Sequence, residues 1–275
     1  MSDKELVLSA DVLNILLRDH TTGMNIFWAT HDYESLGSEY DYHSQILPEL
    51  ITGEHGMVIR PRVLKSKEKQ TDRSKDMAEV FTPSWICDAQ NNLIEASLLS
   101  PQREEDWMWY VRTTCLETTC GEAPYLVSRY DATTGEPIPL EKRIGLLDRK
   151  LRVVSKNTKT SEEWLEWSEV AYKNIYGYEW QGDNLLLARQ NLLFSFIEYY
   201  KAKFATLPPE EAILSIAEIV SWNLWQMDGL RGVPPDYPSP GELQDNPIPD
   251  MFTTYCILRD WDNNKEIRYI DLINT

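Results

Sequence analysis

Residues 113–136 read TTCLETTCGEAPYLVSRYDATTGE, and this stretch decides what we expect of the fold. A β-rich run without a breaker, from Trp109 to Thr119, leads into a turn at Cys120-Gly121. Residues 123–126 can open a helix, because proline is tolerated in a first helical turn. The pattern therefore predicts a strand, a tight turn and a helix start. In an α/β sheet such a turn lies at the carboxyl end of a strand, where nucleotide-like ligands bind, although an ordinary strand-to-helix loop has the same pattern.

The segment from Glu117 to Leu126 resembles the S-adenosylmethionine-binding motif of DNA adenine methyltransferases, the M subunits of restriction-modification systems. That motif usually reads Asp-Pro-x-Cys-Gly-x-Gly-x-Phe-Leu. Ala123 stands at the second glycine, which narrows the room for a backbone close to the ligand. The resemblance implies S-adenosylmethionine as cofactor, with a site that includes Glu117, Thr119, Cys120, Gly121 and Tyr125. It also implies an α/β, Rossmann-like methyltransferase fold over residues 61–275, with residues 1–60 as a small N-terminal extension.

A second element of this family, Gly-Glu-Phe-Tyr-Thr-Pro, resembles residues 79–83, which read Glu-Val-Phe-Thr-Pro. In the family it helps to close the site over the methionine end of the cofactor, and the resemblance gives this role to Phe81, Thr82 and Pro83. Thr82 and Pro83 also suit the start of a helix. We expect its buried face to consist of Trp85, Ile86, Ala89, Leu93 and Ala96.

Two acidic residues follow predicted strands further along the chain. Residues 176–180 form a short strand candidate before a long helix that runs towards Phe204. Glu179 ends this strand, where Rossmann-like sites place an acid that accepts hydrogen bonds from the ribose hydroxyls. Residues 222–230 resemble the family's third cofactor element, in which the aspartate contacts adenine. The matching residue is Asp228, although Asp-Gly also marks ordinary turns.

The family's catalytic Asn-Pro-Pro-Tyr is absent from this sequence. In the family, Asn or Asp holds the target amine and an aromatic ring stacks on the flipped base. Two segments compete for this place: Asn246-Pro247, within the long, breaker-rich loop expected at residues 231–250, and Asp260-Trp261, at the end of a strand. Residues 255–272 otherwise have the pattern of a β-hairpin.

Charge gives mixed evidence about partners. A formal charge of −17 argues against general affinity for nucleic acid, so DNA binding needs a local basic face. Residues 60–76 and 143–159 are the two basic segments, and either could contact the phosphates of DNA. Either could instead be a face exposed to solvent, and in the second segment Arg149, Lys150 and Arg152 would then point to water. A restriction or specificity subunit could supply target recognition.

The sequence leaves several functions open. The leading hypothesis is transfer of a methyl group to the exocyclic amine of adenine in DNA. The alternative is a catalytically silent, methyltransferase-like interaction or DNA-mimic protein. The acidity of the chain and the missing catalytic motif favour this alternative. RNA or protein as the acceptor stays open, because cofactor motifs do not identify the acceptor.

Several patterns bear on the rest of the molecule. We expect helices after Ser9 or Asp11, over residues 160–175 with a capping box, and from Pro208 to Val220, and a short strand at residues 25–29. The histidines at positions 20, 31, 43 and 55 have no zinc-motif spacing, so we expect no metal. No charge-free run is long enough to span a membrane, and we expect a cytoplasmic protein with reduced cysteines.

Overall fold

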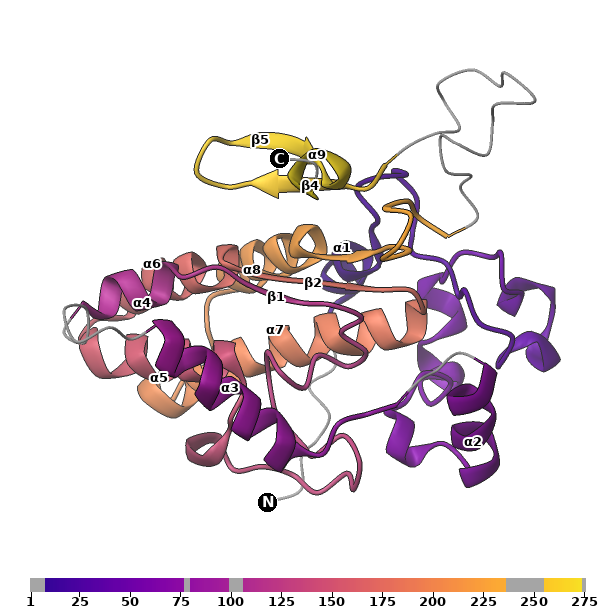
Figure 1. Ribbon diagram of the computed structural model, residues 1–275, viewed down its shortest axis with the longest axis horizontal. Helices are drawn as coiled ribbons and strands as arrows, with labels where there is room; N and C mark the ends of the chain where they lie inside the picture. Colours follow the sequence, from indigo (N-terminus) through magenta and orange to yellow (C-terminus); the bar gives the residue numbers. More distant parts are fainter. Residues whose placement is uncertain (1–7, 77–79, 99–105, 236–254, 274–275) are drawn as a thin grey trace.

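The computed structural model describes residues 8–76, 80–98, 106–235 and 255–273. Its centre is a parallel sheet of three strands, β1 (Cys115–Glu117), β2 (Ile175–Glu179) and β3 (Leu224–Gln226), in the order β1-β2-β3. Parallel neighbours need crossover connections, and helices supply them. The first crossover contains α5 (Leu146–Asn157) and α6 (Ser161–Lys173), and the second contains α7 (Gly182–Phe204) and α8 (Glu210–Asn223). The protein is therefore a mixed α/β structure (Figure 1).

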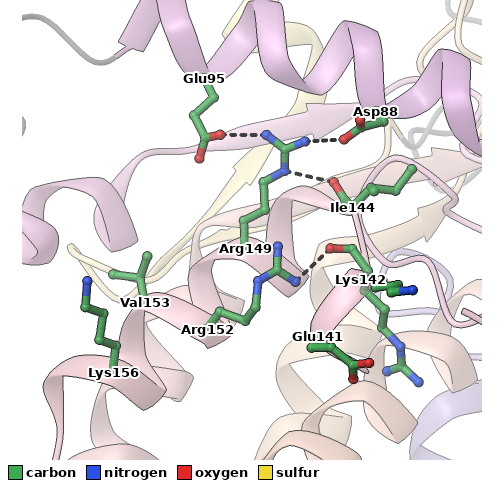
Figure 2. Close-up of a pocket in the computed structure, with 10 residues that line it drawn as sticks. Asp88, Glu95, Glu141, Lys142, Ile144, Arg149, Arg152, Val153 and Lys156 are labelled. Atoms are coloured by element: carbon green, nitrogen blue, oxygen red, sulfur yellow. Dashed lines mark hydrogen bonds and ion pairs between the residues drawn. The ribbon is translucent and has the colours of Figure 1, made fainter. Parts of the chain in front are cut away.

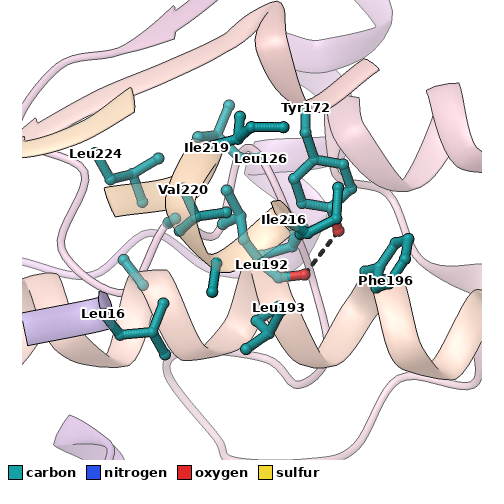
Figure 3. Packing of buried hydrophobic residues seen from close by; sticks show 14 of the residues in the cluster. Leu16, Leu126, Tyr172, Leu192, Leu193, Phe196, Ile216, Ile219, Val220 and Leu224 are labelled. Atoms are coloured by element: carbon teal, nitrogen blue, oxygen red, sulfur yellow. Dashed lines mark hydrogen bonds between the residues drawn. The ribbon is translucent and has the colours of Figure 1, made fainter. Parts of the chain in front are cut away.

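The two faces of the sheet are covered differently. The larger core lies on the side of α7 and α8, where apolar side chains of the two helices interlock with Leu126 and Leu224 (Figure 3). In this core the buried hydroxyl of Tyr172 donates a hydrogen bond of 2.7 Å to the carbonyl of Leu192. Alternate residues of the strands, Tyr178 and Trp225, point to a second, smaller core.

A hairpin covers this second face (Figure 1). Strands β4 (Ile257–Asp260) and β5 (Lys265–Arg268) pair antiparallel and lead into α9 (Tyr269–Ile273). Cys256 and Leu258 pack against Tyr178 and Trp225. The hairpin predicted from the sequence is confirmed, although its second strand was expected to reach residue 272 and ends at Arg268, where α9 begins. The hairpin forms a separate sheet from β1-β2-β3.

The first residues described pack into the larger core. Helix α1 (Ala10–Leu17) starts at Ser9, whose hydroxyl accepts a hydrogen bond from the amide of Val12, and it buries Leu13 and Leu16. The strand predicted at residues 25–29 is wrong, since this segment forms only isolated bridges to Arg18 and Gln45. Short 3-10 helices and α2 follow: η1 (Glu34–Leu36), η2 (Ser38–Tyr40), η3 (Pro48–Leu50), η4 (Gly53–His55), η5 (Arg62–Leu64) and α2 (Lys67–Asp76).

The stretch around β1 differs from its prediction at both ends. The first four residues of the strand expected from Trp109 belong to helix α4 (Trp107–Arg112), because the carboxylate of Asp106 caps the amide of Trp109 at 2.9 Å. No helix starts at residues 123–126, which form turns. The next helical segments are η6 (Leu140–Lys142) and α5. The turn after β1 is therefore followed by a long connection.

Helix α3 (Ser84–Leu98) forms where the Thr-Pro start predicts it, but its apolar face is turned outward. Trp85 is 71% exposed and Leu93 is 72% exposed, so the predicted buried face is wrong. The inner face is polar: the amide of Asn91 donates to the carbonyls of Tyr125 and Ile144 at 3.0 and 3.1 Å. The periodicity of apolar residues predicts that the helix has two different faces, but not which one is buried. Here the hydrogen bonds of Asn91 hold the polar face inside.

The second half of the sheet follows its prediction. Thr160 and Glu163 form the expected capping box at the start of α6. Strand β2, helix α7, helix α8 and strand β3 lie within a few residues of their predicted positions.

Candidate functional site at the carboxyl edge of the sheet

The carboxyl ends of the parallel strands bring the predicted acids to one edge. Glu117 ends β1, Glu179 ends β2, and Asp228 follows β3 by two residues. The turn after β1 crosses to β2, since the amide of Cys120 donates to the carbonyl of Tyr178 at 2.9 Å. The amide of Gly121 donates to Oε2 of Glu179 at 2.8 Å. Residues from two distant stretches therefore form one contiguous site.

The backbone of this turn is left-handed at three positions. Gly121 has a φ of +56°, Thr119 +47° and Ala123 +60°. Glycine adopts this conformation freely, whereas a residue with a Cβ atom pays roughly 1 kcal/mol. The buried Ala123 therefore adopts a backbone conformation that glycine would adopt without this cost. The exposed hydroxyl of Thr119 donates to the carbonyl of Thr118 at 2.7 Å.

Both buried carboxyl groups of the site accept hydrogen bonds from backbone amides. Glu117 accepts hydrogen bonds from the amides of Tyr125 and Leu126 at 3.4 and 3.2 Å. Glu179 accepts from Gly121 and, at 3.2 Å, from Gln181. Burial raises the pKa of Glu117 to about 8, and burial also raises the pKa of Glu179. Burial therefore opposes the ionised form of both carboxyls, whereas the hydrogen bonds from backbone amides favour it.

Phe81 covers the turn. A Cβ atom placed on Gly121 would lie 2.8 Å from Cε1 of Phe81, whose side chain is buried. Thr82 and Pro83 are half-buried beside it, and the thiol of Cys87 donates to the carbonyl of Thr82 at 3.7 Å. The space directly over Gly121 is therefore filled by an aromatic ring in this conformation.

Two further predicted residues lie close to this edge. Tyr125 is half-buried, and its hydroxyl donates to the side chain of Gln90 on α3. Asp228 caps a turn, because its Oδ1 accepts from the amides of Leu230 and Arg231 at 2.9 and 3.2 Å. Its carboxylate is thereby held by the backbone that follows β3.

The structure does not bring Asp260 and Trp261 to this edge. The indole of Trp261 donates to Oδ1 of Asn223 at 2.8 Å, and Asn223 is the residue immediately before β3. Trp261 therefore lies at the amino end of the strands, while Glu179 and Asp228 lie at the carboxyl end. Asp260 accepts the amides of residues 262 and 263 in the hairpin turn. Asn246 and Pro247 lie outside the described residues.

One ionic cluster beside the site was missed in the sequence. Asp183, in the first turn of α7, is fully buried and accepts bonds from Tyr33, Lys65 and Arg73 at 2.8, 2.6 and 3.0 Å. The two cations hold the pKa of its carboxyl well below the usual range, although burial alone would raise it. The only local signal is an acid in a first helical turn, where the helix dipole favours it.

The second basic segment also turns much of its charge inward. Arg149 is 8% exposed and Lys150 is 2% exposed, so the interpretation that both face water is wrong. Arg149 pairs with Asp88 and Glu95 of α3 at 2.8 and 2.6 Å. The ammonium of Lys150 donates to the carbonyl of Thr113, and burial lowers its pKa to about 8. Arg152 is half-buried.

Metal ions and membranes are two further classes of possible partner for the described part of the chain. Within it, no group of three or more His, Cys, Asp or Glu side chains is arranged to hold a metal ion. Among the same residues, no helix combines the length and apolar character needed to cross a membrane. No protein-family model, curated protein or solved structure matches this chain.

Proposed function

We propose that this protein is an S-adenosylmethionine-dependent methyltransferase that acts on the exocyclic amine of adenine in DNA, within a restriction-modification system. The finer fold class, a Rossmann-like methyltransferase domain, is part of this proposal. The observation that supports it best is the meeting of Glu117, Gly121 and Glu179 at the carboxyl ends of adjacent parallel strands. Ligands of open α/β sheets bind at this edge.

The residues present suit the cofactor by type and by order along the chain. Glu179 would hold the ribose hydroxyls, Asp228 the adenine, and the turn at Gly121 the methionine portion under Phe81. The cofactor would supply an electrophilic methyl group, and the protein would hold acceptor and donor in line. For Glu179 to take this role, its bond to the Gly121 amide has to be exchanged for bonds to the ribose, and Phe81 has to move off the turn.

The closed state of the turn favours a second candidate function. Phe81 fills the space over Gly121, both acids are hydrogen-bonded to backbone amides, and Asp260 and Trp261 lie away from this edge. A methyltransferase-like protein that no longer catalyses, and acts as an interaction or DNA-mimic module, would keep such a turn as part of its core. The charge of −17 agrees with that role.

Calorimetry with S-adenosylmethionine separates the two candidates. For the methyltransferase we expect binding by the wild-type protein, and an affinity loss of roughly tenfold or more in Glu179→Gln, because a charge-assisted bond to each hydroxyl is weakened. Glu136→Gln, an exposed change in the connection after β1, is the matched control and should bind normally. Thermal unfolding shows whether Glu179→Gln is folded.

The variant Phe81→Ala tests whether the ring over Gly121 blocks binding of the cofactor. Absence of binding at millimolar cofactor in both wild type and Phe81→Ala would exclude the cofactor site. Binding by Phe81→Ala alone would favour the silent protein, since the ring would then close a cleft that is otherwise intact. Transfer of a labelled methyl group from the cofactor to adenine in DNA is the result that supports the enzyme over the silent protein.

A further inference from the structure

A second candidate site lies on the flank of the molecule, where α3, η6 and α5 meet (Figure 2). It is an open pocket with a volume of about 500 Å³, within the size range of small-molecule sites. None of the residues at the carboxyl edge of the sheet lines it. Its lining is dominated by charged side chains: Asp88, Glu95, Glu141, Lys142, Arg143, Ile144, Arg149, Arg152, Val153 and Lys156.

Two of the five basic residues in this lining are already neutralised. Arg149 bridges the carboxylates of Asp88 and Glu95, and its Nε donates to the carbonyl of Ile144 at 3.0 Å. Arg143 pairs with Glu198 at 2.6 Å. These bonds fix the walls of the pocket, because they join α3 to α5 and η6 to α7.

The other three basic residues form no ion pair with any residue that the structure describes. They are Lys142, Arg152 and Lys156. The guanidinium of Arg152 is nevertheless held in place, since its NH1 donates to the carbonyl of Arg143 at 2.7 Å and to the hydroxyl of Tyr199 at 3.1 Å. Lys156 is four residues further along α5, on the same face of the helix. Figure 2 shows Lys142 and Lys156 on opposite sides of Arg152.

This group of cations stands out in so acidic a chain. In a protein with a net charge of −17, three basic residues without an ion pair in the described structure line one hollow. A planar guanidinium matches the oxygens of a phosphate group, and ammonium groups on either side add charge-assisted hydrogen bonds.

We propose that this pocket binds a compact, multiply phosphorylated small molecule, with Arg152 at its centre and Lys142 and Lys156 on either side. The size and the charge favour a compact anion. A DNA duplex, whose backbone has the same phosphate chemistry, would have to lie across Glu141 and the acidic face of α3 at Asp88 and Glu95.

The test uses tripolyphosphate as the probe, with binding to the full chain measured by calorimetry. We expect the double variant Lys142→Gln/Lys156→Gln to bind at least roughly tenfold more weakly than wild type, because two charge-assisted contacts are lost. The matched control is Lys67→Gln/Lys201→Gln, which removes the same charge from exposed lysines that do not line the pocket. Equal weakening in both double variants, or none in the pocket variant, overturns the proposal.

Competition identifies the source of the phosphate. If a short DNA duplex displaces tripolyphosphate and itself loses affinity in the pocket variant, the pocket serves a nucleic-acid backbone and the small-molecule proposal is wrong. If the duplex does not compete, the proposal holds. Glu179→Gln should leave tripolyphosphate binding unchanged, so failure of the methyltransferase proposal does not affect this result.

Discussion

The two basic segments, 60–76 and 143–159, look alike in sequence and serve different ends in the structure. In the first segment Lys65 and Arg73 turn inward to one buried acid, Asp183, while the exposed lysines of α2 alternate with acids. In the second, buried cations join neighbouring helices and Arg152 remains at a pocket. A run of positive charge therefore says little about a binding surface until the partners of each cation are known.

The largest effect that tests this contrast should come from Asp183→Asn. The change takes away the buried acid that pairs with Lys65, which is 6% exposed, while Arg73, which is 2% exposed, keeps its ion pair with Asp32 at 2.6 Å. Removing one member of a buried ion pair typically costs about 3–5 kcal/mol, because the remaining charge is uncompensated. We expect a loss of this size in the free energy of unfolding, measured by urea denaturation at neutral pH.

The carboxylate of Asp183 also predicts how the stability of the fold changes with pH. The pKa of Asp183 is lowered in the folded state, so its stabilisation is present above the unfolded value of 3.8 and is lost as the pH falls below it. Asp183→Asn should therefore flatten this acidic part of the stability profile. A variant as stable as wild type would show that the cluster contributes nothing, and the contrast between the segments would lose its basis.

A smaller effect is expected at Lys150, in the second segment. Burial lowers the pKa of this ammonium from 10.5 to about 8, so between these values the unfolded chain holds a proton that the folded protein has released. Lys150 should then contribute a rise in stability with pH across this window, of at most about 1.4 kcal/mol per pH unit, against the opposite contribution of buried cysteines whose pKa values are raised. Lys150→Met removes the titrating group and should remove this rise in urea denaturation measured from pH 7.5 to 10.5.

The exposed Lys156, on the same helix, provides the control. Lys156→Met should keep the rise, because its ammonium is in water in both states. A rise that persists in Lys150→Met would mean that another group titrates in this range.

The elements predicted correctly are those whose determinants lie within a few neighbouring residues. The capping box of Thr160 and Glu163, and the alternation of β2, are encoded within a few residues, and both formed as expected. Residues 109–112 have strong β-propensity, yet they are helical because Asp106 caps them and the helix packs on α5. β-propensity includes neither the helix cap nor the packing on α5, so it predicted a strand at these residues.

The remainder of the site depends on distant partners. Lys65 is 118 residues from Asp183, and no local pattern joins them. The amide of Gly121 meets Glu179 only because β1 and β2 are neighbours in the sheet. The outward face of α3 has the same cause: Arg149, far along the chain, draws the acids of the helix inward. The sequence could thus indicate the strands of the sheet and candidate residues at their ends, but not which charges are already paired.

The smallest effect should come from Lys67, and Lys65, two residues earlier, provides the comparison. Lys67→Met changes an exposed side chain without a recorded partner in the described structure, and we expect the unfolding free energy to shift by less than about 0.5 kcal/mol. Lys65→Met, by contrast, removes a buried partner of Asp183 and should cost roughly 1–3 kcal/mol. Both variants replace a lysine by methionine, so the change in net charge and the side-chain length are matched. Urea denaturation of the two in parallel therefore isolates the inward contact, and equal losses would mean that the charge of the segment as a whole, and not the pairing of Lys65, stabilises the fold.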